Sequence, residues 1–190
     1  MEHGGPDDSA LVRAAQQGDR DAFAGIVRRY QRAVYGVAYG LTRRAEDADD
    51  LAQEAFVRAY RSIGSFRVGE PLYPWLSRIT VNLAYSLFRS RKRRPEAALE
   101  PLLEQGQQWA ADDDPVAEVE GGERAALLRE QFATLSPEHQ AILVLRVVEG
   151  LSYDEIARTL GVPPGTVMSR LSRARAELKA KLAARTGEAP

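Results

Sequence analysis

The chain has 190 residues and balances 26 lysines and arginines against 27 aspartates and glutamates, which gives a formal net charge of −1. An apolar content of 44% suffices for packed cores and excludes wholesale disorder. The lack of cysteine excludes disulfides, thiolate metal sites and a cysteine nucleophile. No apolar run approaches the roughly 18–20 residues of a membrane span, and the polar start lacks the core of a signal peptide. We therefore expect a soluble, cytoplasmic protein without direct membrane insertion.

Charge is distributed in three blocks along the chain. Residues 1–94 carry a net +5, residues 95–123 carry nine acids and no base, and residues 124–190 carry a net +3. The middle block is rich in proline and glycine and includes three consecutive aspartates, a composition typical of linkers. We predict two domains, at 1–94 and 124–190, joined by a flexible acidic linker at 95–123 that permits many relative placements.

The first block has the periodicity of helices. Apolar residues recur at three- and four-residue steps, and the alternating pattern of strands is nearly absent. The spacing predicts helices over 9–17, 21–41, 45–63 and 73–93, with Pro74 tolerated in the first turn of the last one. Each helix is too polar to be stable alone, so we expect a small helical bundle.

The second block has clear helix start and stop signals. Ser136 before a proline is typical of a helix N-terminus and predicts a helix over 138–149. Ser152 and Glu155 form a capping box that starts the next helix, which ends at Gly161. A further helix then runs to about residue 184. Two helices joined by a glycine turn are typical of a helix-turn-helix.

The last predicted helix has an apolar face and a polar, basic face. If Val167, Leu171 and Ala174 face the core, the opposite face presents serine, threonine and arginine side chains. Such a helix fits the DNA major groove, where these side chains read base edges and outer cations hold phosphates. The alternative is an amphipathic helix with a solvated basic face, but the capping box and glycine turn in register favour DNA binding. The candidate DNA-contacting residues are Thr166, Met168, Ser169, Arg170, Ser172, Arg173 and Arg175.

A second basic cluster lies at the end of the first domain, where no acid occurs between Pro71 and Pro95. Aromatic residues are interleaved with its arginines, and bases of single-stranded nucleic acid stack on such rings while cations follow the backbone. Two alternatives stay open, since Trp75 fits a helical core and the arginines fit a solvated helix end. The cluster consists of Arg78, Arg89, Arg91, Lys92, Arg93 and Arg94, with Phe66, Tyr73, Trp75, Tyr85 and Phe88.

Three stretches in this order resemble one protein family. They are DADDLAQEAFVRAYRSIGSFR at 47–67, PWLSRITVNLAYSLFRSRKRRP at 74–95 and LSPEHQAILVLRVVEGLSYDEIARTLGVPPGTVMSRLSRARAEL at 135–178. They are similar to the extracytoplasmic-function sigma factors of bacterial RNA polymerase, in the sigma-70 superfamily. The resemblance implies an all-α fold, with a region 2 helical bundle and a region 4 helix-turn-helix domain.

The resemblance also implies roles for residues of the first domain. Asp50, Leu51, Gln53 and Glu54 resemble the surface that binds the clamp helices of the polymerase's largest subunit. From the residues alone, this helix face would be an ordinary solvated one. Phe66, Arg67, Arg78 and Asn82 resemble the part that captures flipped bases of the −10 element and holds the DNA open.

In the second domain, the helix from Thr166 resembles the reader of the −35 element. The resemblance directs Ser169, Ser172 and Arg173 toward bases, and the neighbouring arginines at 170 and 175 toward phosphates. Met168 departs from the family pattern, in which a basic residue is frequent at this point.

The function implied is that of a promoter-specificity subunit with no catalytic residues, no metal site and no cofactor. Its implied partners are the RNA polymerase core, through the clamp helices and the flap, promoter DNA and an anti-sigma factor. The alternative is a helix-turn-helix repressor or activator that binds DNA independently of polymerase, usually as a dimer. An enzyme is disfavoured, because the chain has two histidines, His3 and His139, and no phosphate-binding loop or nucleophile motif.

Overall fold

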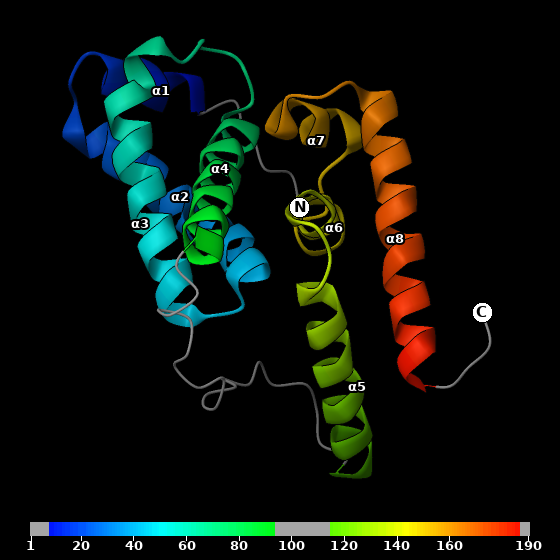
Figure 1. Cartoon of the computed structure of the whole chain (residues 1–190). Coiled ribbons are helices and arrows are strands. Elements are labelled where there is room, and N and C mark those ends of the chain that lie inside the picture. The colour runs from blue at the N-terminus through cyan, green and yellow to red at the C-terminus, as the bar shows by residue number, and fades with distance from the viewer. Residues whose placement is uncertain (1–7, 94–114, 187–190) are drawn as a thin grey trace.

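The structure, a computed structural model, describes residues 8–93 and 115–186, together with the backbone but not every side chain at the start of the second range. Within these ranges every regular element is a helix (Figure 1). The all-α prediction is therefore confirmed for the described part of the chain. Most of the predicted acidic linker lies outside the described residues.

The first domain is a bundle of four α-helices. They are α1 (Asp8–Gln16), α2 (Arg20–Thr42), α3 (Ala45–Ser62) and α4 (Leu72–Arg93), with a short 3-10 turn η1 (Ile63–Ser65) after α3. Asp19 starts α2, because its carboxylate accepts hydrogen bonds from the backbone N–H groups of Asp21 and Ala22 at 2.8 and 3.0 Å. All four helices lie within a few residues of their predicted bounds.

The core of this bundle follows the apolar stripe of α2. Its centre includes Ile26, Val34 and Val37, which have no solvent exposure and belong to one buried cluster with Leu72 and Leu76 of α4. Apolar burial of this kind supplies most of the stability of such helices, at roughly 1.5–3 kcal/mol for each fully buried aliphatic side chain.

The second domain contains one helix that the sequence analysis did not predict. It consists of α5 (Pro115–Ala133), α6 (Pro137–Leu143), a π-helical turn η3 (Val144–Val148), α7 (Tyr153–Leu160) and α8 (Pro164–Thr186). Helix α5 begins inside the predicted linker and contains the Gly121–Gly122 pair that made this segment resemble a linker. Tertiary packing overrides that local signal, since Phe132 is buried and α5 packs against α8.

The helix predicted over 138–149 is α-helical only in its first part. After Leu143 the chain widens into the π turn, which ends before Gly150 at φ 68°. A π turn holds an extra residue and shifts the direction of the side chains that follow it.

The two domains pack against each other in one arrangement. Helix α4 contacts α7, α2 contacts the π turn, and side chains of both domains share one hydrophobic core (Figure 1). We expected many relative placements from the linker composition. The structure instead shows a buried seam between the domains, which the linker composition gave no reason to expect.

Candidate nucleic-acid interface

The helix-turn-helix has the predicted caps. The Ser152 backbone N–H donates to Glu155 Oε2 at 2.8 Å, and the Glu155 N–H donates to Ser152 Oγ at 3.3 Å, which closes the capping box. Gly161 ends α7 in the left-handed conformation at φ 66°, where a side chain would be strained. These local signals set the angle at which α8 leaves the turn, so the predicted motif is confirmed.

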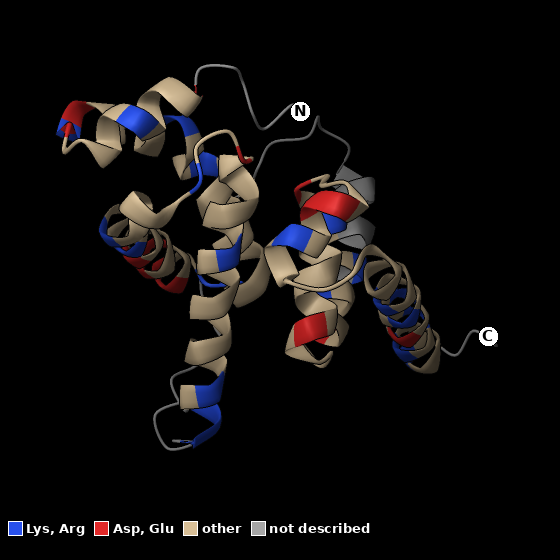
Figure 2. Ribbon diagram, turned by 90° about the horizontal axis from the view of Figure 1, so that it is seen from above, with Lys and Arg blue, Asp and Glu red and all other residues tan. Residues whose placement is uncertain are grey.

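Helix α8 turns the predicted face outward. Val167, Leu171 and Ala174 are at most 2% exposed and fix the rotation of the helix. Met168 is 58% exposed, whereas Thr166 and Arg170 are half-buried. The other predicted DNA contacts, Ser169, Ser172, Arg173 and Arg175, are all exposed. Lysines and arginines recur along α8, which is the helix nearest the C-terminus in Figure 2. Their contacts with −35 DNA stay a prediction.

The loop before α4 and the first turns of α4 form a hollow of about 250 Å³. Its wall contains Phe66 and Trp75, whose ring centroids lie 4.9 Å apart at 50°. Arg67 and Arg78 also line it, so three of the four predicted −10 residues lie together. Asn82, the fourth, is exposed further along α4 and is not among the lining residues.

Sequence reasoning missed one of the three arginines of this hollow. Arg158 comes from α7 of the second domain and lines the hollow beside Arg78. Among the described residues, neither of these arginines nor Arg67 has a carboxylate within 4 Å, although Glu70 also lines the rim. The hollow therefore combines aromatic rings with three arginines that have no ion pair in the described part of the chain. This chemistry suits an unstacked base and its phosphate. No local sequence signal connects Arg158 with this site, because only tertiary packing brings it there.

The predicted polymerase-binding face lies on α3. Asp50 and Gln53 are exposed, and Glu54 is half-buried and accepts from Arg58 Nε at 2.7 Å. Leu51 is only 7% exposed, because its position belongs to the apolar stripe of the helix, so its side chain packs into the core. Leu51 thus lies beneath the exposed residues of this face, and its part in binding the polymerase stays a prediction.

Two apolar residues extend this face beyond the prediction. Val57 and Tyr60 are 42% and 43% exposed and follow Gln53 at helical spacing. Tyr60 also borders an apolar hollow of about 510 Å³ with Phe23 of α2. The sequence contained a signal for this extended face, since two large apolar side chains continue the polar face of an amphipathic helix.

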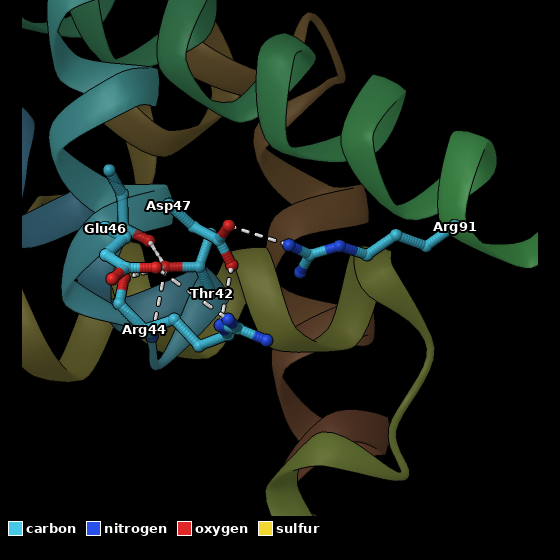
Figure 3. A network of polar contacts seen from close by, with 6 residues as sticks. Thr42, Arg44, Glu46, Asp47 and Arg91 are labelled. Carbon is cyan, nitrogen blue, oxygen red and sulfur yellow. Dashed lines mark hydrogen bonds and ion pairs between the residues drawn. The ribbon is translucent and has the colours of Figure 1, made fainter. Parts of the chain in front are cut away.

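A polar network ties the start of α3 to the end of α4. Asp47 Oδ1 pairs with Arg91 Nη2 at 2.7 Å, and Asp47 Oδ2 lies 3.6 Å from Arg44 Nε (Figure 3). The aspartate at 47 is therefore held in two ion pairs with arginines. In the ranges that the structure describes, no group of three or more potential metal ligands occurs.

His139 pairs with another side chain. Its Nδ1 lies 2.8 Å from Glu177 Oε2, which joins α6 to α8, and its side chain is 20% exposed.

The described helices include none that is both long enough and apolar enough to cross a bilayer.

Comparison with known proteins gives one family for both domains. The sigma-70 region 2 family matches residues 26–94, and the sigma-70 region 4 family matches residues 125–178. The RNA polymerase sigma-H factor of Pseudomonas aeruginosa is 38% identical over 88% of this chain and 90% of its own length. The ECF RNA polymerase sigma-E factor of Haemophilus influenzae is 37% identical, over 92% and 95% respectively.

Two solved structures are similar over both domains. CnrH, solved in complex with the cytosolic domain of CnrY, superimposes with a TM-score of 0.68 and 27% identity, covering 94% of this chain and 99% of CnrH. The sigma factor RpoE from Bartonella quintana, solved with the anti-sigma factor NepR, gives a TM-score of 0.65 and 26% identity, covering 84% of this chain and 96% of RpoE. With a matching family on each domain and relatives aligned over nearly their whole length, this chain belongs to the extracytoplasmic-function (ECF) sigma factors of bacterial RNA polymerase.

Proposed function

We propose that this chain directs the RNA polymerase core to specific promoters by reading the −35 element with α8 and capturing bases of the −10 element beside α4. The observation that carries the proposal is the pairing, in one chain, of a capped helix-turn-helix with an arginine-lined aromatic hollow. The first reads duplex DNA and the second suits unpaired bases. A subunit that melts promoter DNA needs both chemistries.

In this proposal, DNA opening is driven by binding. A base that leaves the stack enters the hollow beside Phe66 and Trp75, and Arg67 and Arg78 hold its phosphates. Unstacking costs a few kcal/mol, which the captured base regains from stacking and ion pairing. Asn82 then supplies a hydrogen bond to a neighbouring nucleotide. The chain acts here as a non-catalytic subunit, and the polymerase performs the chemistry.

The exposed face of α3 binds the polymerase. Asp50 and Gln53 provide the polar contacts to the clamp helices, and Val57 and Tyr60 provide an apolar centre next to them. An apolar centre within a polar rim is typical of protein interfaces. The second domain contacts the flap. Because its relative RpoE was solved with the anti-sigma factor NepR, we also propose that an anti-sigma factor controls this chain.

The test is reconstitution with the polymerase core. Pull-down followed by run-off transcription from a matched promoter should give a transcript that depends on this chain. Gln53→Ala combined with Tyr60→Ala should abolish core binding and leave DNA contacts intact, whereas Arg173→Ala should spare core binding and lose promoter-specific transcripts. Specific binding to a palindromic site without any association with polymerase would instead identify an independent helix-turn-helix regulator.

A further inference from the structure

One loop supplies much of the wall of the −10 hollow. Residues 63–71 connect α3 to α4 and contain no regular structure beyond the 3-10 turn η1. The lining residues that come from this loop are Ser65, Phe66, Arg67, Glu70 and Pro71. Gly69 has a φ of 95°, and backbone of this kind is conformationally free unless other contacts hold it. The shape of the hollow therefore depends on what fixes this loop.

The side chain of Gln16, at the end of α1, reaches this loop from outside it. Its amide nitrogen donates to the backbone carbonyl of Ile63 at 2.9 Å and to that of Phe66 at 2.7 Å. A glutamine amide has two N–H donors, so both are used on the loop. One carbonyl belongs to the first residue of η1 and the other to the residue that follows it. Gln16 therefore bridges the turn that carries Phe66 into the wall of the hollow.

One of these hydrogen bonds also sets the direction of Arg67. The Phe66 carbonyl belongs to the planar peptide unit that joins Phe66 to Arg67, so a fixed carbonyl fixes the plane from which Arg67 leaves. On the other side of its Cα, Phe66 donates its N–H to the Ile63 carbonyl at 3.0 Å. The backbone of Phe66 is thus held in both directions, while its ring packs against Trp75.

Helix α1 is anchored at both ends, so Gln16 donates from a fixed position. At the start of the helix, the Asp8 carboxylate accepts from Nη1 of Arg29 at 2.6 Å and from the hydroxyl of Tyr30, and both partners lie on α2. At its end, the backbone N–H groups of residues 17–19 donate to carbonyls of the last turn. A side chain on a helix held in this way can keep a neighbouring loop in one position.

We infer that Gln16 is a positioning residue for base capture, which holds the loop in the shape that the −10 hollow requires. The inference rests on the proposed function of the hollow. Gln16 is not among the lining residues, so it acts through the loop backbone and not on the DNA. Ordering a free loop at the moment of binding costs affinity, whereas a loop that is already ordered meets the unstacked base with its ring and its arginine in place.

The test removes the two donors and keeps the length of the side chain. Gln16→Met does this, because the methionine side chain is similar in length and has no N–H group. The matched control is Gln17→Met, since Gln17 is exposed and its side chain does not bond to either carbonyl. Circular dichroism during thermal unfolding verifies that both variants are folded at the temperature of the assays.

Amide hydrogen exchange of the full chain, followed by mass spectrometry, reports the order of the loop directly. In Gln16→Met, exchange in residues 64–71 should be about tenfold faster than in the parent, because the backbone has lost two hydrogen bonds. Exchange in α2 and α3 should be unchanged. Gln17→Met should exchange like the parent throughout.

Base capture is measured with the reconstituted holoenzyme and a single-stranded oligonucleotide that carries the −10 element. Gln16→Met should weaken its binding about tenfold, and Gln17→Met should not. Oligonucleotides with one abasic site each identify the captured base as the position at which the parent loses most affinity. In Gln16→Met the same abasic site should cost less than about threefold, because the base no longer meets an ordered hollow. A general loss of stability would instead leave the full abasic penalty in place.

The outcomes separate the inference from the proposed function. Unchanged exchange of the loop in Gln16→Met would overturn the positioning role. Faster exchange with unchanged oligonucleotide binding, or with the full abasic penalty, would overturn its link to base capture. If no abasic site weakens binding by the parent holoenzyme, the proposed function of the hollow fails, and the hold of Gln16 on the loop is still decided by the exchange result.

Discussion

Met168 is the residue of α8 whose role can be tested most sharply. It is an apolar side chain, 58% exposed, among the polar and basic residues of the predicted −35 face. Full burial of a methionine side chain is worth about 1.5–3 kcal/mol, so the exposed part of Met168 can gain roughly 0.9–1.7 kcal/mol on contact with DNA. The thymine C5-methyl group is the apolar feature of the major groove that such a side chain can contact.

We therefore expect Met168→Ala to weaken promoter binding by the holoenzyme by about 5- to 18-fold. The assay is a fluorescence titration with the promoter found by sequencing transcripts after overexpression. Replacing single thymines of the −35 element by deoxyuridine removes the methyl group alone. In the parent chain, one such replacement should weaken promoter binding as much as Met168→Ala does. In Met168→Ala, the same replacement should leave binding unchanged.

The matched control is Leu171→Ala, three residues further along the same helix. Leu171 is 2% exposed, so its truncation should cost about 2–5 kcal/mol of unfolding free energy, whereas Met168→Ala should change it by less than about 0.5 kcal/mol. Thermal unfolding separates the two effects. If no thymine replacement distinguishes the parent from Met168→Ala, Met168 does not read a methyl group.

Three further predictions concern stability and charge. Burial raises the pKa of Tyr73 and Tyr30, and it raises the pKa of Tyr85 to about 12, so the folded chain keeps protons that the unfolded chain loses near pH 10. The free energy of unfolding should therefore be constant below pH 10 and fall between pH 10 and 12. Urea unfolding measures this fall, which should be smaller in Tyr73→Phe. A single tyrosine titration near pH 10 at 295 nm in the folded chain would contradict it. Asp47→Asn should release the arginines at 44 and 91 and lower the melting temperature by a few degrees, in contrast to Asp49→Asn at an exposed position. Deleting residues 96–114 removes six acids, so nonspecific DNA binding should become tighter and more salt-sensitive, and an unchanged salt dependence would refute it.

Local signals predicted the helices and the helix-turn-helix well, because periodicity and caps act within a few residues. Ser152 with Glu155 and the glycine at 161 are sufficient to define α7, and both behave in the structure as their residue types require. Helix α5 was missed because two glycines and a weakly patterned stretch favoured a linker, while its burial depends on α8.

The seam and the shared hollow could not be predicted in the same way. Arg158 reaches the −10 hollow and Glu149 reaches Tyr73 through contacts between residues far apart in sequence. One signal was present, because Gly36 and Gly40 are four residues apart inside a predicted helix, a spacing that indicates close approach of another element. It did not indicate which element approaches these glycines.

The early start of α5 has a consequence for the range of promoters that the chain can use. Between the end of α4 at Arg93 and Pro115, 21 residues remain, and covalent geometry limits their reach to ~70–75 Å even when fully extended. That is shorter than the ~85 Å between the centres of the two promoter elements. If the two domains read these elements as proposed, the length of the chain between them and the widths of the domains together limit how far apart the elements can lie. A promoter whose two elements lie beyond that limit should not be read at both elements by one chain.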